Sequence, residues 1–255
     1  MIHFDVTTSD GVCPVSLFTP AGAGPWPGVL LIIDGGGVRT ALFEMAQDLA
    51  NEGYAVAVPD LMYRVGSPLV MIPEGKPRDM KGLFSLLGDP AVRAVWVQKY
   101  IGGTNTPANV KTDFAAILPA LAARPEVKAG RFGITGYCMG GTISLRAAGL
   151  FPEHFAVIAS FHGGHLATAA PDSPHLGLPR IKAELYVAGA EEDPSFTEEI
   201  RQRLTAALVA SGNVHTVETW AGSRHGFSVR DAPVYKPEFG ARHDTVLREL
   251  FRRTL

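Results

Sequence analysis

Short apolar segments alternate with amphipathic segments along most of this chain. Residues 28–33 read Gly-Val-Leu-Leu-Ile-Ile without a polar side chain, as expected of a strand buried on both faces of a parallel sheet. Residues 40–52 carry apolar side chains at helical spacing and end at Gly53, which favours a helix. Further strands are predicted at residues 2–7, 12–18, 54–59, 131–135, 155–161, 182–188 and 214–220, and further helices at residues 89–101, 108–123, 139–150, 196–210 and 239–254.

This alternation predicts an α/β fold with a mostly parallel, doubly wound sheet and helices on both faces. Only a short turn joins the first two strands, so they should form an antiparallel hairpin. Residues 61–88 contain three prolines and several glycines and are predicted as a long loop, of a length that is usually functional or mobile. Because no repeat, low-complexity tract or linker interrupts the pattern, residues 1–255 are expected to form a single domain.

Composition and charge narrow the classes of function. The formal net charge is −2, which argues against nucleic acid or an anionic membrane as partner. No apolar run reaches 18 residues, and the first residues lack the basic and apolar segments of a signal peptide. The only cysteines are Cys13 and Cys138, so a disulfide framework is excluded and a reducing cytoplasm is the expected compartment.

The strongest chemical signal surrounds Cys138. Residues 136–141 read Gly-Tyr-Cys-Met-Gly-Gly between a predicted strand and a predicted helix, which is the Gly-x-Ser-x-Gly nucleophile elbow with cysteine in place of serine. Such a turn strains its central residue and needs small neighbours, and the positive end of the following helix favours a thiolate. A buried cysteine at a tight turn is the alternative interpretation. Cys13 is expected to pack inside a strand as a small hydrophobic residue.

A cysteine nucleophile needs a base, and the base needs an acid that orients it. Asp193 and His225 each follow a predicted strand, and the site of an open parallel sheet lies at the carboxyl ends of its strands. The order nucleophile, acid, histidine is that of α/β-hydrolases. We therefore predict Cys138, Asp193 and His225 as the catalytic residues, with Glu192 as the alternative acid because it adjoins Asp193.

Two backbone N–H groups are expected to bind the oxyanion of an acyl-transfer intermediate. One should belong to Met139, directly after the nucleophile, and the other to Gly35 in the loop Asp34-Gly35-Gly36-Gly37. A plain strand-to-helix turn or a phosphate loop are alternatives for this loop, but the G-x-G-x-x-G and G-K-[ST] patterns are absent. No cofactor is therefore predicted. The pair His162-x-x-His165 lacks a third ligand at suitable spacing, so no metal site is predicted either.

These residues resemble the dienelactone hydrolase family of α/β-hydrolases, over about residues 1–252. The resemblance is carried by the elbow around Cys138, by the acid turn at residues 190–196 and by His225-Gly226-Phe227, with support from residues 41–46, 58–64 and 161–166. It implies an α/β-hydrolase fold with Cys138 as nucleophile, His225 as base and Asp193 as orienting acid.

The resemblance also bears on the substrate. The family's type enzyme opens an enol-lactone ring. It has a glutamate at the position of Asp34, and its substrate carboxylate is held by arginines, one of them at the position of Val229. Residues expected to line the substrate pocket of this chain are Asp34, Arg64, Tyr137, His162 and Phe227, and a structural role is an open alternative for His162.

Together these features predict a cofactor-independent hydrolase of small activated esters or lactones, acting through a thioester acyl-enzyme, as a monomer or a homodimer. Two other classes of function remain as alternatives. One is a non-catalytic protein of the same fold that binds a ligand or partner. The other is a redox thiol protein, which is disfavoured because the chain has no C-x-x-C motif and no evident resolving cysteine.

Overall fold

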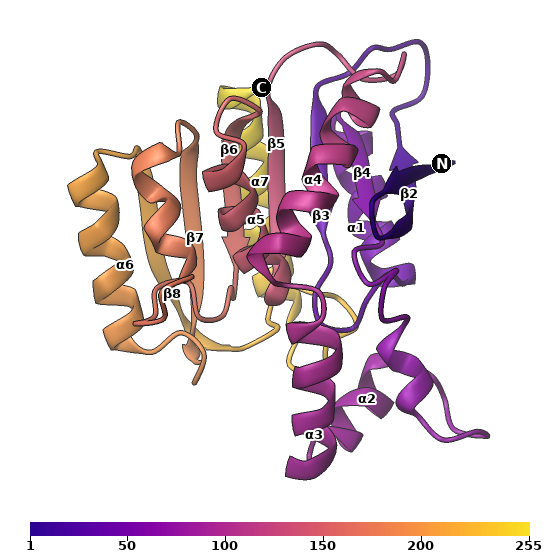
Figure 1. Ribbon diagram of the computed structural model, residues 1–255, viewed down its shortest axis with the longest axis vertical. Helices are drawn as coiled ribbons and strands as arrows, with labels where there is room; N and C mark the ends of the chain where they lie inside the picture. The colour runs from indigo at the N-terminus through magenta and orange to yellow at the C-terminus, as the bar shows by residue number, and fades with distance from the viewer.

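The computed structural model describes residues 1–255 and contains an eight-stranded sheet between two layers of helices (Figure 1). The strand order is β1-β2-β4-β3-β5-β6-β7-β8. β1 and β2 form the predicted antiparallel hairpin, β2 also runs antiparallel to β4, and all other neighbours are parallel. The strands are β1 (Ile2–Thr8), β2 (Gly11–Phe18), β3 (Gly28–Ile32), β4 (Ala55–Pro59), β5 (Phe132–Tyr137), β6 (Phe155–Phe161), β7 (Glu184–Glu192) and β8 (His215–Arg224). The predicted α/β fold with a mostly parallel sheet is confirmed.

Helices cover both faces of the sheet. α1 (Thr40–Asn51) and α7 (Pro237–Thr254) lie on one face, and α4 (Pro107–Ala122), α5 (Met139–Leu150) and α6 (Glu198–Ser211) lie on the other (Figure 1). A short 3₁₀ segment, η3 (Pro174–Arg180), lies beside α5 and α6. Because they are covered on both sides, β3, β4, β5 and β6 are buried along their whole length, which explains why their sequences do not alternate.

Residues 60–106, here called the insertion, leave the carboxyl end of β4 and project beyond the sheet (bottom of Figure 1). They contain η1 (Pro68–Met71), α2 (Met80–Leu86), α3 (Pro90–Trp96) and the π-helical turn η2 (Val97–Gly102), which continues α3. The prediction of an unbroken loop over residues 61–88 is therefore wrong. The carboxylate of Asp79 caps α2 by accepting a hydrogen bond from the N–H of Gly82 at 2.7 Å. A small separate apolar cluster, formed by Ile72, Met80 and Leu83, stabilises this part of the insertion.

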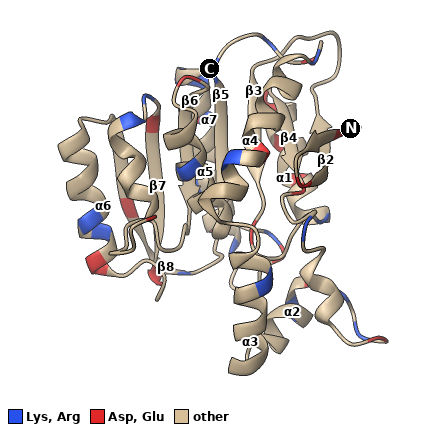
Figure 2. Cartoon of the chain, viewed as in Figure 1, with Lys and Arg blue, Asp and Glu red and all other residues tan.

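Acidic and basic residues are interspersed along the elements (Figure 2), in keeping with the small net charge. None of the helices combines the length and the apolar content that a membrane crossing would need.

Candidate active site

Cys138 lies at the sharp turn between β5 and α5. Its φ of 52° is in the left-handed region, where a side chain other than glycine is strained. The turn is tight enough to exclude larger neighbours: a Cβ added to Gly136 would lie 2.1 Å from the carbonyl oxygen of Gly140, and one added to Gly140 would lie 2.5 Å from that of Ile32. Cys138 thus has the backbone geometry that the sequence predicted for an elbow, at the N-terminal end of α5.

Asp193 and His225 are brought together by the pairing of β7 with β8. This pairing continues past the covered part of the sheet to Glu192 and Arg224, which is why both strands are longer than predicted. The Nδ1 of His225 lies 2.6 Å from Oδ2 of Asp193. Glu192, the alternative acid, is instead exposed and forms an ion pair with Arg224 at 3.3 Å.

Ser195 holds the other side of the Asp193 carboxylate. Oδ1 of Asp193 accepts hydrogen bonds from the backbone N–H of Ser195 at 2.8 Å and from its hydroxyl at 2.6 Å. Burial raises the pKa of Asp193, but the hydrogen bonds from His225 and Ser195 outweigh this effect, so the pKa is lowered overall. The carboxylate is therefore charged and fixed in orientation at neutral pH. Ser195 was not predicted from the sequence. The feature that could have indicated it is its position two residues after Asp193 in a turn.

His225 lies between the carboxylate of Asp193 and the side chain of Cys138. Burial lowers its pKa, but the interactions with Cys138 and Asp193 have the larger combined effect and raise the pKa well above its ordinary value. The site therefore favours the imidazolium form of His225, which can donate a proton from its ring.

His162 lies beneath the elbow rather than in a pocket wall. It is fully buried, its Nδ1 accepts a hydrogen bond from the N–H of Cys138 at 3.1 Å, and its Nε2 lies 3.0 Å from the hydroxyl of Ser228. An accepting Nδ1 requires a neutral ring with its proton on Nε2, and burial lowers the pKa of His162 well below its ordinary value. The prediction of a pocket residue is thus corrected: the ring joins the elbow to the loop that follows His225.

Tyr137 and Phe227, also predicted as pocket residues, are fully buried in the core. The hydroxyl of Tyr137 lies 2.8 Å from Nε2 of His243 in α7, and Phe227 packs against the ring of Trp220. The prediction failed for Tyr137 because successive residues of a strand point to opposite faces. Although Tyr137 is next to Cys138 in sequence, its side chain lies on the other side of the sheet.

The two charged pocket candidates, Arg64 and Asp34, are occupied by other groups. Arg64 donates to the carboxylates of Asp10 and Asp113, both at 2.7 Å. This joins the β1–β2 turn to α4, near the edge strand and several strands from Cys138. The carboxylate of Asp34 is buried and accepts hydrogen bonds from both terminal nitrogens of Arg39. Neither side chain is free to bind a substrate.

The predicted oxyanion loop is held from two sides. The indole N–H of Trp96 donates to the carbonyl of Gly35 at 3.1 Å, and the N–H of Gly36 donates to Oδ1 of Asp34 at 2.8 Å. The N–H of Gly35 donates to no group of the chain. Met139 is the first residue of α5, where backbone N–H groups have no partner within the helix. Both predicted oxyanion donors are therefore available.

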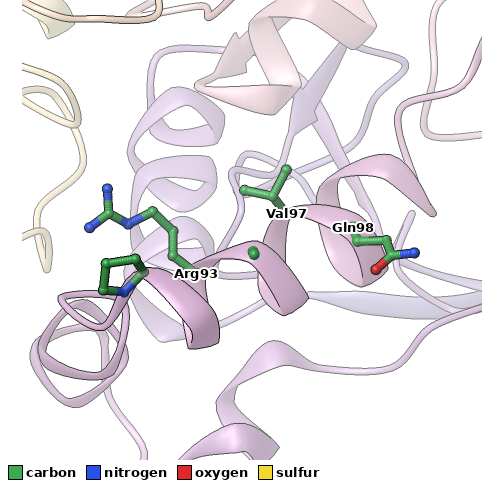
Figure 3. Close-up of a pocket in the computed structure, with 5 residues that line it drawn as sticks. Arg93, Val97 and Gln98 are labelled. Carbon is green, nitrogen blue, oxygen red and sulfur yellow. The ribbon is translucent and has the colours of Figure 1, made fainter.

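A hollow of about 420 Å³ lies on the surface of α3 and η2, lined by Pro90, Arg93, Ala94, Val97 and Gln98. Arg93, Val97 and Gln98 are labelled in Figure 3. None of Cys138, Asp193 and His225 lines this hollow, so it is a feature of the insertion's surface and not of the candidate active site. No group of three or more His, Cys, Asp or Glu side chains is arranged to hold a metal ion.

Comparison with known proteins agrees with this geometry. Residues 14–255 match the model of the dienelactone hydrolase family. The chain belongs to this family. It is therefore an ester or lactone hydrolase, and the resemblance noted in the sequence is confirmed. A Synechocystis protein described as a candidate carboxymethylenebutenolidase is 26% identical over 94% of this chain and 91% of its own length. Hydrolase tropI of Talaromyces stipitatus is 28% identical over 80% of this chain and 71% of its own length.

Two solved structures share the fold of this dienelactone hydrolase family member. A protein of Klebsiella pneumoniae described as a candidate dienelactone hydrolase superposes with a TM-score of 0.80 at 21% identity, covering 98% of both chains. A dienelactone hydrolase-like promiscuous phosphotriesterase from metagenomic libraries superposes with a TM-score of 0.75 at 23% identity, covering 99% of this chain and 97% of its own.

Proposed function

We propose that this protein hydrolyses small activated esters or lactones through a thioester on Cys138. The observation that carries the proposal is the arrangement around His225. Its Nδ1 is bound to Asp193 at 2.6 Å, which leaves Nε2 for the thiol, and its raised pKa depends on the charge of Cys138. Two relatives are described as candidate carboxymethylenebutenolidases, which supports an enol lactone as one substrate of this chain.

The reaction follows from the chemistry of these groups. The thiolate of Cys138 attacks the acyl carbon, and the N–H groups of Gly35 and Met139 stabilise the oxyanion that forms. When the C–O bond breaks, the leaving oxygen takes a proton from the imidazolium of His225 and the thioester remains. His225 then removes a proton from water, which attacks the thioester, releases the acid and restores the thiol.

A thiol nucleophile restricts the substrates that react well. In the tetrahedral intermediate, a thiolate leaves more readily than an ordinary alkoxide, so an unactivated ester returns to the starting state. An enolate or phenolate competes better with the thiolate, because its conjugate acid has a lower pKa. We therefore expect enol lactones and aryl esters to be turned over and simple alkyl esters and amides to react slowly.

The test compares the two cysteines of the chain with p-nitrophenyl acetate. Cys138→Ala should lower turnover by at least about a thousandfold, as loss of a nucleophile does in other acyl-transfer enzymes. It should also abolish acetylation of the protein seen by mass spectrometry. Cys13→Ala is the matched control, because Cys13 is fully buried and its burial raises the pKa of the thiol. Full activity in Cys138→Ala would contradict the mechanism.

A further inference from the structure

Arg39 lies directly before α1, and its guanidinium lies between the two loops that carry proposed catalytic groups. Its side chain is only 7% exposed. Nη1 and Nη2 donate to the carboxylate of Asp34 at 2.6 and 2.8 Å, while Nε and Nη2 donate to the carboxylate of Asp231 at 2.7 and 2.9 Å. Nη1 also donates to the carbonyl of Gly37 at 3.0 Å. All five N–H groups of the guanidinium are thereby used.

On one side, Arg39 is linked to the predicted oxyanion loop through Asp34. Oδ1 of Asp34, which accepts a hydrogen bond from Nη1 of Arg39, also accepts one from the N–H of Gly36 at 2.8 Å. The same peptide group is held at its other end by Trp96, whose indole donates to the carbonyl of Gly35. The N–H of Gly35 belongs to the preceding peptide, which lies between this fixed peptide and Asp34, whose side chain Arg39 holds, and it has no partner in the chain.

On the other side, Arg39 is linked through Asp231 to the loop that follows His225. Three consecutive tight turns join His225 to Asp231. The N–H of Phe227 donates to the carbonyl of Arg224 at 3.0 Å, that of Val229 to the carbonyl of Gly226 at 3.2 Å, and that of Ala232 to the carbonyl of Val229 at 3.0 Å. Because these turns make residues 225–231 a compact unit, the position of the Asp231 carboxylate and that of the imidazole are linked.

The guanidinium has no remaining capacity for a substrate. Its five donors are satisfied inside the protein, and two carboxylates already face its one positive charge. Binding a substrate carboxylate would require one of these ion pairs to break and would add a third negative charge to the cluster. Arg39 therefore differs in role from an arginine that clamps a substrate.

We propose that Arg39 is a positioning residue for acyl transfer, which fixes the oxyanion loop relative to the histidine loop by bridging Asp34 and Asp231. This role rests on the proposed function of Cys138 and His225. It predicts that loss of the bridge slows formation of the thioester, where an oxyanion must be stabilised. It also predicts that the intrinsic reactivity of the thiolate is left nearly unchanged.

Two reactions of Cys138 separate these effects. Acylation by p-nitrophenyl acetate passes through an oxyanion, whereas alkylation by iodoacetamide does not. Arg39→Lys keeps the charge but cannot bind two carboxylates in the bidentate manner of a guanidinium. We expect it to slow acylation by up to about a hundredfold, the lower end of the loss caused by removing one oxyanion donor, while alkylation stays within about twofold of the wild type.

Two further variants complete the test. Asp231→Asn leaves the buried Asp34–Arg39 pair intact, so it should fold. We expect acylation to slow by about three- to tenfold, because the amide oxygen can still accept a hydrogen bond from Arg39 and only part of the charge-assisted contact is lost. Arg64→Lys is the matched control, because Arg64 also bridges two carboxylates but lies away from Cys138. Its acylation rate should equal that of the wild type.

The possible results distinguish this role from the proposed function. If wild-type Cys138 is acylated, and if Arg39→Lys and Asp231→Asn are each acylated as fast as the wild type, the positioning role alone is overturned. Parallel losses in acylation and alkylation would overturn it as well, because Arg39 would then act on the thiolate or on the fold. If p-nitrophenyl acetate does not acylate wild-type Cys138, the proposed function fails, and the role of Arg39 fails with it.

Discussion

Two regions of the chain contribute to the active-site edge of the sheet, and they do so by different physical means. Between β5 and the histidine loop, functional side chains are fixed by strand-end turns and short hydrogen bonds, such as the 2.6 Å contact between His225 and Asp193. The insertion contributes mainly by packing. The ring of Trp96 lies against Gly35 and the side chain of Met80 lies against Gly36. A Cβ added at either glycine would lie 2.4 Å from the side chain next to it.

The contrast is between the groups proposed to react, which the strand ends hold, and the groups of the insertion that pack around them. A strand end in a buried sheet has few degrees of freedom, so it can hold reacting atoms at fixed distances. The insertion also exposes large apolar side chains, with Val95 at 55% and Phe84 at 39%, and its helices are short. We infer that the strand ends determine the rate of the chemical step, and that the insertion determines how well the predicted oxyanion loop is supported.

The largest effect that tests this division is expected at Asp193, the proposed orienting acid. Asp193→Asn should lower kcat by about two to four orders of magnitude, because an amide cannot hold His225 in the orientation and charge state that acylation requires. Glu192→Gln is the adjacent control: Glu192 is exposed and pairs only with Arg224, so kcat should change less than about twofold. The reverse ranking of the two variants would show that the acid has been assigned to the wrong residue.

The strand-end region was also the part most readily predicted from sequence. The helix after Cys138 and the strand at residues 155–161 have the predicted bounds, and Asp193 and His225 lie together as their strand-end positions suggested. These features depend on local patterns: an apolar run, a glycine-flanked turn and a chain order. Each is written in consecutive residues, and the parallel sheet then brings the strand ends to one edge.

What the sequence did not reveal depends on the direction of side chains and on distant partners. Arg39 is separated from Asp231 by 192 residues, and no local pattern marks the pair. Arg64 was expected in the pocket, yet its carboxylate partners place it at another part of the sheet. The helix α2 was missed because prolines and glycines surround the spacing of Met80 and Leu83, which otherwise fits a helix.

A smaller effect is expected where the insertion contacts the oxyanion loop. Trp96→Phe keeps most of the ring but removes the indole N–H that donates to Gly35. Losing one such bond costs about 0.5–1.5 kcal/mol, so kcat should fall by about two- to tenfold. Val95→Ser, one residue earlier on the exposed side of α3, is the control and should leave kcat unchanged. A loss comparable with that of Asp193→Asn would contradict the division between the two regions.

The smallest effect concerns the charge of the substrate, because the arginine between the two loops that carry proposed catalytic groups already has two carboxylate partners. Val229, at the position of a substrate-binding arginine in the type enzyme, is fully buried. Arg39 is paired with two carboxylates, and Arg93 donates through Nε to the carbonyl of Leu87 and lines the hollow on α3 (Figure 3).

We therefore expect activated lactones with and without a carboxylate to be hydrolysed with kcat/KM values within about tenfold of each other. One charge-assisted contact to a substrate carboxylate would be worth about 1.5–3 kcal/mol, or about ten- to a hundredfold, so a matched pair of lactones measures how many such contacts exist. A preference of more than about a thousandfold for the acid would require at least two cations at the site. In that case the insertion, with Arg78, Lys81 and Arg93, would have to supply the cations that bind the carboxylate. It would then determine the selectivity for the charge of the substrate as well as for its shape.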